Sequence, residues 1–208
     1  MPASAARRWR ASASRFWPAT SCRPDRHVAE LPVAERPGTL VLVLGGARSG
    51  KSRHAEALIE SRPPPFFYAA TAQALDGEMA ERIALHRARR DGRWITHDSP
   101  LHLAELLAEL PQEVPLLVDC LTLWLTNHLL ADHDLAAEQE RLLAALRRRV
   151  GLTVLVANEV GLGIVPDNAL ARRFRDAAGR LNQAVAAIAD HVVFTMAGLP
   201  MTVKGQMP

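Results

Sequence analysis

One stretch, LVLVLGGARSGKSRHAEALIE from Leu40 to Glu60, constrains the fold of this chain more than any other. Within it, GGARSGKS satisfies the pattern G-x-x-x-x-G-K-[ST], in which a glycine-rich loop surrounds phosphate groups. An apolar run precedes the loop and a segment with helical spacing follows it, which is the context that this pattern requires. The stretch therefore predicts a phosphate-binding loop in an α/β fold. The alternative is a glycine-rich turn that holds no ligand.

The residues of this loop have separate expected roles. The glycines let successive backbone N–H groups point at the β-phosphate, and the following helix adds its positive amino-terminal end. Lys51, which with Lys204 makes up the lysines of the chain, is expected to reach the β- and γ-phosphates. Ser52 is expected to hold Mg²⁺ through its hydroxyl. The predicted nucleotide-binding residues are Gly45, Gly46, Ala47, Arg48, Ser49, Gly50, Lys51 and Ser52.

Short apolar runs alternate with longer segments of helical spacing along most of the chain. The predicted strands are residues 40–44, 66–70, 114–118, 153–157 and 192–195. The predicted helices are residues 51–61, 77–90, 101–110, 121–130, 135–150 and 169–189. The strands have few outward polar positions, so we expect them to be buried on both faces. The alternation predicts an α/β fold of the P-loop NTPase class, with a mostly parallel sheet and helices on both faces.

Residues 1–38 differ in composition from the rest of the chain. They contain seven arginines and three acidic residues, whereas the other 170 residues carry 18 basic and 19 acidic side chains. The segment has no helical or strand periodicity and lacks the apolar region of about 7 to 15 residues that a secretory signal needs. We predict a disordered Arg-rich extension at residues 1–38, with an organelle transit peptide as the alternative, and a single domain at residues 39–208.

Composition also limits the expected location and partners. No run of about 18 apolar residues occurs, so no membrane span is expected. Cys22 and Cys120 are isolated thiols, which fits a reducing compartment, and we expect a cytoplasmic protein. The pI of about 9.4 arises from the N-terminal segment and is poor support for nucleic-acid binding. DNA binding through that segment is kept as an alternative.

Two further strand ends supply polar groups. In LLVDCLTLW, Asp119 follows an apolar run, where a P-loop protein needs an acidic residue to orient the metal. The alternative is that Asp119 caps the helix beginning at Leu121. In VLVANEVGLGIVP, Asn158 and Glu159 occupy another strand end, where they either contact a γ-phosphate or form a turn.

The segment DGEMAERIALHRARRDGRW places a histidine among arginines. If residues 77–90 are helical, Arg82, Arg89 and Arg90 lie at i−4, i+3 and i+4 from His86, on one face of the helix. The positive charges are expected to lower the pKa of His86 and keep its imidazole neutral, able to attack an α-phosphorus. The alternative is a solvated basic helix face with an incidental histidine.

Five segments of the chain resemble a known family. GGARSGKSRHAEALIE, YAATAQALDGEMAERIALHRARR, LLVDCLTLWLTN, NEVGLGIVPDNALARRFRDAAGRLNQAVA and MAGLPMTVKG are similar, in this order, to the bifunctional adenosylcobinamide kinase/adenosylcobinamide-phosphate guanylyltransferases of cobalamin biosynthesis. The resemblance implies a RecA-like homo-oligomer, with a trimer as one candidate. It implies ATP, GTP, adenosylcobinamide and its phosphate as substrates, with Mg²⁺ as cofactor.

The same resemblance implies a reaction and further site residues. Adenosylcobinamide is phosphorylated, and GMP then passes from GTP through a histidyl-GMP intermediate to give adenosylcobinamide-GDP and pyrophosphate, with His86 as the guanylylated residue. The additional nucleotide contacts that it implies are Thr71, Ala72, Gln73, Arg87, Ala88, Arg89, Arg90, Asp98 and Asp119. Members often carry glutamate where this chain has Asp98 and Asp119. Two alternatives stay open: a P-loop small-molecule kinase without guanylyl transfer, and a non-catalytic RecA-like nucleotide-binding protein.

Overall fold

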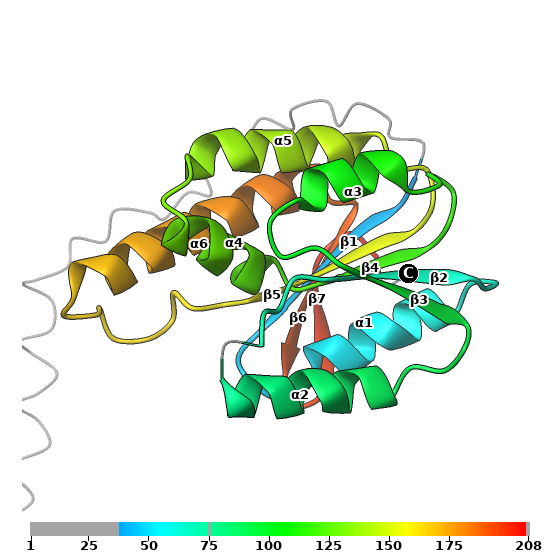
Figure 1. Ribbon diagram of the computed structural model, residues 1–208, viewed down its shortest axis with the longest axis horizontal. Helices are drawn as coiled ribbons and strands as arrows, with labels where there is room; N and C mark the ends of the chain where they lie inside the picture. Colours follow the sequence, from blue (N-terminus) through cyan, green and yellow to red (C-terminus); the bar gives the residue numbers. More distant parts are fainter. Residues whose placement is uncertain (1–37, 75, 207–208) are drawn as a thin grey trace, which may run out of the picture. The chain divides into compact units, whose positions relative to one another are not determined.

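The described residues form one seven-stranded sheet with helices on both faces (Figure 1). The computed structural model describes residues 38–74 and 76–206, so the extension predicted at residues 1–38 lies, apart from Gly38, outside it. In spatial order the strands are β3 (Trp94–Asp98), β2 (Phe66–Ala70), β4 (Leu116–Asp119), β5 (Thr153–Asn158), β1 (Leu40–Gly45), β6 (His191–Met196) and β7 (Leu199–Lys204). Neighbouring strands are parallel except for the antiparallel pair β6 and β7, which confirms the predicted α/β class.

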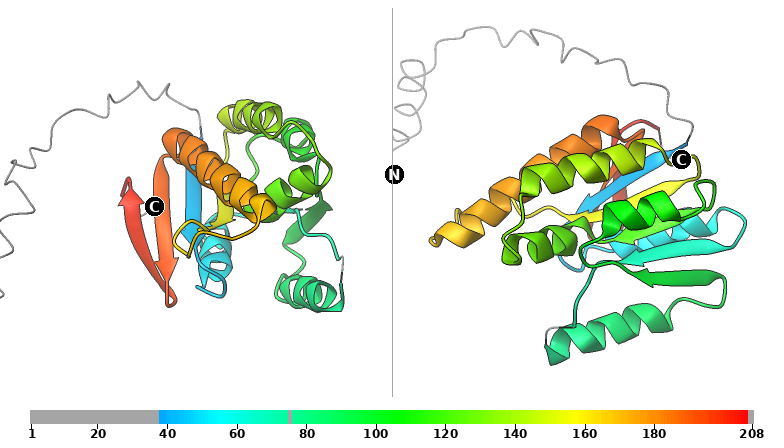
Figure 2. Two further views of the ribbon diagram at one scale, coloured as in Figure 1. Left: turned by 90° about the vertical axis from the view of Figure 1, so that its left-hand side faces the viewer. Right: turned by 45° about the horizontal axis from the view of Figure 1, so that its top comes forward.

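The helices divide between the two faces of the sheet. Within the described residues they are α1 (Lys51–Glu60), α2 (Gly77–Ala88), α3 (Leu103–Glu109), α4 (Leu121–Leu130), α5 (Leu135–Arg147) and α6 (Ala169–Ile188). Figures 1 and 2 show α3, α4, α5 and α6 over one face, with α1 and α2 on the other. None of the helices in this part of the chain is long and apolar enough to cross a membrane.

Strand β1 shows how the sequence produces this layering. Because successive side chains of a strand point to opposite faces, Leu40 and Leu42 pack in the cluster beneath α3 to α6, whereas Val41 and Val43 pack against α1. All four side chains are fully buried. A strand that is covered on both faces is apolar at consecutive positions, which is why the run before the glycine-rich loop has no polar residue.

Three departures of the observed elements from the predicted ones affect the fold or the site, and the bounds of the other elements differ from the predicted bounds by at most three residues. Strand β3 was not predicted, because Trp94 is the only one of its five residues that is buried, so its pattern is not apolar. Strand β7 was not predicted either; it is an edge strand with large apolar side chains exposed to solvent. Helix α2 ends at Ala88 rather than Arg90, which changes the surroundings of His86.

Candidate active site

The predicted site residues gather at the carboxyl edge of the parallel strands. The glycine-rich loop follows β1, and Thr71 follows β2. In the register of the sheet, Ala70 of β2 lies opposite Asp98 of β3 on one side and Asp119 of β4 on the other. Open α/β sheets bind their ligands outside the carboxyl ends of the strands, so this edge is the candidate active site.

The loop between β1 and α1 has the backbone of a phosphate-binding loop. Gly50 has a φ of 94°, which L side chains rarely adopt, and it precedes α1 without a side-chain cap. At Gly45 a Cβ atom would lie 2.5 Å from the carbonyl oxygen of Thr195, so only glycine fits there. The hairpin between β6 and β7 supports the loop, since the Gly198 N–H donates to the Ser49 carbonyl at 2.9 Å. The uncapped N–H groups at the start of α1 remain available to an anion.

Lys51 lies over its own loop. Its Nζ donates to the carbonyl oxygen of Gly46 at 3.1 Å. Burial lowers the pKa of Lys51, while the nearby Cys120 and Asp119 side chains oppose that shift. The ammonium group of Lys51 therefore interacts electrostatically with the Asp119 carboxylate, and contact of either group with a phosphate or a metal stays a prediction.

Asp119 ends β4 and is held by a tyrosine. The Tyr68 hydroxyl donates to Asp119 Oδ2 at 3.1 Å, and burial raises the pKa of Tyr68, so this hydroxyl keeps its proton. The alternative of a helix cap is wrong, because the N-cap of α4 is Cys120 and has no side-chain cap hydrogen bond. The described hydrogen bond of the Asp119 carboxylate is the one from Tyr68.

His86 of α2 reaches the same carboxylate. Its Nδ1 lies 3.9 Å from Asp119 Oδ2 and 2.9 Å from Nη2 of Arg89. The pKa of His86 is lowered, as predicted, but burial is the largest cause. Asp119 opposes the shift, and the charges of Arg89, Arg90 and Arg82 add to it. The imidazole is therefore held in its neutral form, the form that can act as a nucleophile.

Arg90 does not lie on the face of α2 where a longer helix would have placed it. Because α2 ends at Ala88, the guanidinium of Arg90 instead stacks on the ring of Tyr68, 3.6 Å from the ring centroid. Its Nε and Nη1 atoms are buried and have no hydrogen-bond partner among the described residues. Two buried donor atoms on a cation that stacks on Tyr68 are suited to an anionic ligand.

The remaining predicted contacts are placed differently. Thr71 is fully buried, and its hydroxyl accepts from the Cys120 N–H and donates to the Cys120 carbonyl, so it supports the end of β4. Nη2 of Arg87 donates to both carboxylate oxygens of Asp98, at 2.9 and 3.0 Å. The side chains of Ala72 and Ala88 have no polar atom, and the exposed side chain of Gln73 makes no hydrogen bond to the described residues. Direct contact of any of these residues with a nucleotide stays a prediction.

The end of β5 lies between the loop and the strand of Asp119. The Glu159 N–H donates to the Gly45 carbonyl at 3.2 Å, and the Asn158 N–H donates to the hydroxyl of Thr122 at 2.7 Å. Asn158 Oδ1 is buried without a hydrogen-bond partner in the described part of the chain. Asn158 thus stands beside the phosphate loop, while Glu159 Oε1 accepts the N–H of Gly161 in the turn that follows.

Sequence reasoning missed two residues of the site, Tyr68 and Glu56. Tyr68 is the only tyrosine of the chain and interrupts a strand of apolar residues, and this signal was available. Glu56 lies on α1, and its Oε1 is 3.8 Å from Nη2 of Arg89. Burial raises the pKa of Glu56, whereas Arg89 lowers it. No sequence pattern distinguishes Glu56 from an ordinary helix-face carboxylate.

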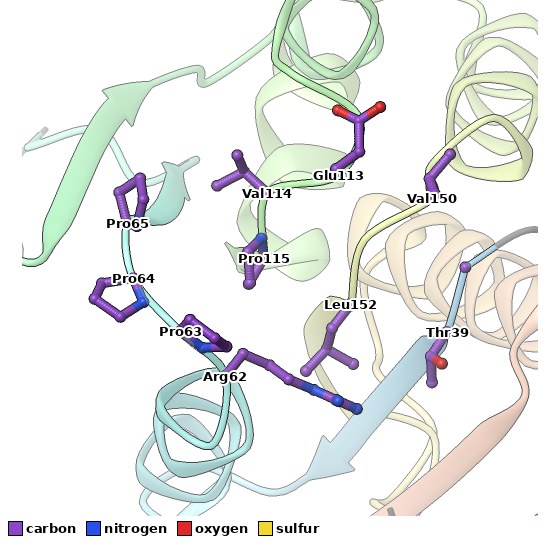
Figure 3. A pocket seen from close by; sticks show the side chains of 11 residues that line it. Thr39, Arg62, Pro63, Pro64, Pro65, Glu113, Val114, Pro115, Val150 and Leu152 are labelled. Carbon is purple, nitrogen blue, oxygen red and sulfur yellow. The ribbon is translucent and has the colours of Figure 1, made fainter.

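A concave region lies away from the predicted site residues. It has a volume of about 470 Å³ and is lined by Thr39, Pro65, Pro115 and Leu152, which precede β1, β2, β4 and β5 (Figure 3). It therefore lies at the amino edge of the sheet, opposite the phosphate loop. None of the predicted site residues lines it.

A phosphate loop, a strand-end carboxylate and a mostly parallel sheet define a nucleotide-binding protein of the P-loop class. Residues 41–203 match the family model described as "Cobinamide kinase / cobinamide phosphate guanyltransferase". The chain belongs to this family.

Curated relatives agree with this assignment. A "Bifunctional adenosylcobalamin biosynthesis protein CobP" of Pseudomonas aeruginosa is 54% identical over 168 residues, which cover 79% of this chain and 97% of the relative. A "Bifunctional adenosylcobalamin biosynthesis protein CobU" of Salmonella typhimurium is 46% identical over 181 residues, covering 79% and 99%. Among solved structures, the RadB recombinase has a TM-score of 0.46 and 16% identity, covering 76% of this chain and 74% of its own.

Proposed function

We propose that this protein performs two successive transfers on one substrate. It phosphorylates the hydroxyl of adenosylcobinamide with ATP or GTP, and it then transfers GMP from GTP through His86 to the new phosphate. The products are adenosylcobinamide-GDP and pyrophosphate. The observation that carries the proposal is the proximity of His86 to Asp119, with Nδ1 and Oδ2 3.9 Å apart. Asp119 ends β4, and one strand, β5, separates β4 from β1, which leads into the phosphate loop.

In the kinase step the protein mainly positions groups and stabilises charge. The loop N–H groups and Lys51 hold the β- and γ-phosphates, so Lys51 exchanges its bond to the Gly46 carbonyl for phosphate oxygens. The hydroxyl of the acceptor attacks the γ-phosphorus, the bond to the β-phosphate oxygen breaks, and the proton of the hydroxyl leaves to a base. Asn158 Oδ1, buried beside the loop, is placed to orient the reacting groups.

The described donor set suits Mg²⁺ bound together with a nucleotide. No group of three or more His, Cys, Asp or Glu side chains in the described ranges could hold a metal ion by itself. Mg²⁺ usually binds through one or two carboxylates plus phosphates and waters rather than in a protein cage. Ser52 and Asp119 would hold it, and it would neutralise the charge that develops on the phosphates.

In the guanylyl step a nitrogen of His86 attacks the α-phosphorus of GTP. The bond to the β-phosphate oxygen breaks, and pyrophosphate leaves with the electron pair. An oxygen of the substrate phosphate then displaces His86 from the guanylyl group. In the second displacement two anions, the substrate phosphate and the guanylyl group, must approach each other. Arg90, with two unpartnered buried donors among the described residues, is suited to stabilise the phosphates.

The expected homo-oligomer is part of this proposal. Strand β7 exposes Leu199, Met201 and Val203 on the edge of the sheet, and such a strand is a suitable surface for association. We include a cytoplasmic homo-oligomer in the proposal, with a trimer as one candidate. Light scattering of the purified protein measures the subunit number directly.

Labelling with GTP tests the transferase half. The protein is incubated with Mg²⁺ and GTP labelled at the α-phosphate, then denatured. We expect label that stays on the chain, is released by acid and not by base, and is absent in His86→Gln. His97→Gln is the matched control, since His97 lies on β3 outside the proposed chemistry, and it should keep the label.

The two halves of the proposal separate experimentally. Label absent from a folded, GTP-binding protein would contradict guanylyl transfer and leave a small-molecule kinase. Failure to transfer the γ-phosphate of ATP or GTP to adenosylcobinamide would contradict the kinase step and leave the guanylyl step unaffected.

A further inference from the structure

The hydrogen bond between Arg89 and His86 determines which nitrogen of the imidazole carries the proton. Nη2 of Arg89 lies 2.9 Å from Nδ1 of His86. A guanidinium can only donate hydrogen bonds, and it does not lose its charge in proteins. Nδ1 must therefore be the acceptor, so the ring is neutral and its proton is on Nε2.

In this arrangement neither ring nitrogen is available as a nucleophile. The lone pair of Nδ1 accepts the hydrogen bond from Arg89, and Nε2 carries the proton. His86 has to lose its bond to Arg89 before either nitrogen can attack a phosphorus. The neutral charge of the ring is thus necessary for the reaction and is not sufficient.

Arg89 and His86 each lie near a carboxylate as well as near one another. Arg89 Nη2 is 3.8 Å from Glu56 Oε1, which is buried and makes no hydrogen bond within the described residues. On the other side, Nδ1 of His86 is 3.9 Å from Asp119 Oδ2. A carboxylate beside Nδ1 favours the tautomer in which Nδ1 carries the proton, and that tautomer leaves the lone pair on Nε2.

The other arginines near His86 do not share this role. Arg90 is stacked on Tyr68, and Arg82 affects His86 through its charge, without a described hydrogen bond to the ring. In the described part of the chain, Arg89 is the one guanidinium within hydrogen-bond distance of the imidazole.

We propose that Arg89 is a positioning residue that selects the tautomer of His86. Without nucleotide, its bond to Nδ1 keeps both nitrogens unreactive. When the phosphates of a bound nucleotide attract Arg89, Nε2 gives its proton to water and Nδ1 takes a proton from water. The resulting Nδ1–H group donates a hydrogen bond to Asp119 Oδ2. Nε2 then forms the bond to the α-phosphorus, and pyrophosphate departs with the electron pair. This inference rests on the proposed guanylyl transfer, and it explains how His86 avoids reacting before GTP is in place.

Nitrogen NMR of protein with ¹⁵N-labelled histidine measures the tautomer directly, with His86→Gln used to assign the signal. Without nucleotide, we expect the Nε2–H form in the wild type and the Nδ1–H form in Arg89→Met. Arg82→Met is the matched control, because it removes a nearby charge without removing the hydrogen bond, and it should keep the Nε2–H form. Adding Mg²⁺ and α,β-methylene GTP, which cannot release pyrophosphate, should convert the wild type to the Nδ1–H form.

Chemical modification adds a second measurement. Diethylpyrocarbonate reacts with an unprotonated imidazole nitrogen, and without nucleotide His86 should react about tenfold faster in Arg89→Met, the scale expected for losing a hydrogen bond from a charged donor. A wild-type Nδ1–H ring, an unchanged tautomer in Arg89→Met, or equal modification rates would overturn the inference. If Arg89→Met does not fold, the wild-type spectra with and without the analogue still decide.

These outcomes are distinct from failure of the proposed function. Label from α-labelled GTP on His86, together with a tautomer independent of Arg89, would support guanylyl transfer and overturn the role of Arg89. If the tautomer depends on Arg89 but the protein never accepts label, the role of Arg89 is supported and guanylyl transfer through His86 is contradicted.

Discussion

The phosphate loop and helix α2 supply the same edge of the sheet, but they are attached to the protein in different ways. The loop joins β1, which is buried on both faces, to α1, whose Ala55 and Ile59 are fully buried. Helix α2 has no buried residue. Its described links to the other elements are polar: Arg87 with Asp98, His86 with Asp119, and Arg89 with Glu56.

The difference separates two requirements of the proposed chemistry. Holding a triphosphate requires fixed backbone donors, and core packing fixes the loop. The nucleophile has to approach the nucleotide and then release the guanylyl group. Helix α2 has no buried residue and its Arg87–Asp98 pair is exposed to water, so the helix can rearrange at a lower free-energy cost than the loop. We therefore expect substitutions in the loop to have large effects on both folding and phosphoryl transfer, and substitutions on the links of α2 to act mainly on guanylylation.

The largest expected effect concerns Lys51. Lys51→Ala removes the cation that stabilises the transferred phosphoryl group, so the rate of phosphoryl transfer to adenosylcobinamide should fall about 10²- to 10³-fold. Lys204→Ala is the matched control, because Lys204 donates to the Ala186 and Ala187 carbonyls and lies outside the site. Activity that survives in Lys51→Ala would show that the loop does not hold the reacting phosphates.

A pair of glycine substitutions compares the rigidity of the two regions. Gly50→Val forces a side chain into a φ of 94°, so the free energy of unfolding, measured in urea, should fall by about 1 to 3 kcal/mol. At Gly77, the first residue of α2, a Cβ atom meets nothing within 4 Å. Gly77→Ala should leave stability unchanged or raise it slightly. Equal losses of unfolding free energy at the two positions would show that the loop and α2 are equally rigid.

Removing one link of α2 should affect the helix and leave global stability nearly intact. In the Arg87–Asp98 pair the side chains are 54% and 64% exposed, so Arg87→Met should change the free energy of unfolding by less than about 1 kcal/mol. Hydrogen exchange of the α2 amides should nevertheless accelerate relative to that of α1. High salt should have the same effect on the wild type, because it screens exposed pairs. Exchange as slow in α2 as in α1 would count against a loosely held helix.

The smallest expected effect is a difference between two pH profiles. The pKa of His86 is lowered from 6.5, so the neutral ring persists as the pH falls through 6.5, and the labelling rate at pH 6.5 should be within about twofold of its value at pH 7.5. The pKa of Lys51 is lowered from 10.5, so kcat/KM for phosphoryl transfer should decline on the alkaline side, below pH 10.5. A labelling midpoint at or above pH 6.5 would contradict the first expectation.

The sequence was sufficient for the parts of this fold that follow from burial. The apolar run from Leu40 and the pattern after it identified the phosphate loop, and Asp119 followed from its place at the end of another apolar run. Strands β3 and β7 were missed because edge strands are covered on one side at most, so their patterns resemble those of loops.

The contacts of side chains from distant segments could not be predicted in the same way. Spacing alone placed Arg89 and Arg90 together around His86, but the end of α2 at Ala88 sends them to different partners. The link from Tyr68 to Asp119 joins residues 51 positions apart, and no periodicity encodes it. Helix ends and long-range pairs are decided by the packed structure.

The order of the strands sets a length in the active site. Strand β5 lies between β1, which carries the phosphate loop, and β4, which carries Asp119. Since neighbouring strands are about 4.8 Å apart, the loop and the carboxylate are separated by about 10 Å across the sheet. That interval leaves room for a phosphate chain with its hydrated cation. Because backbone hydrogen bonds hold it, exchanging side chains cannot narrow or widen it.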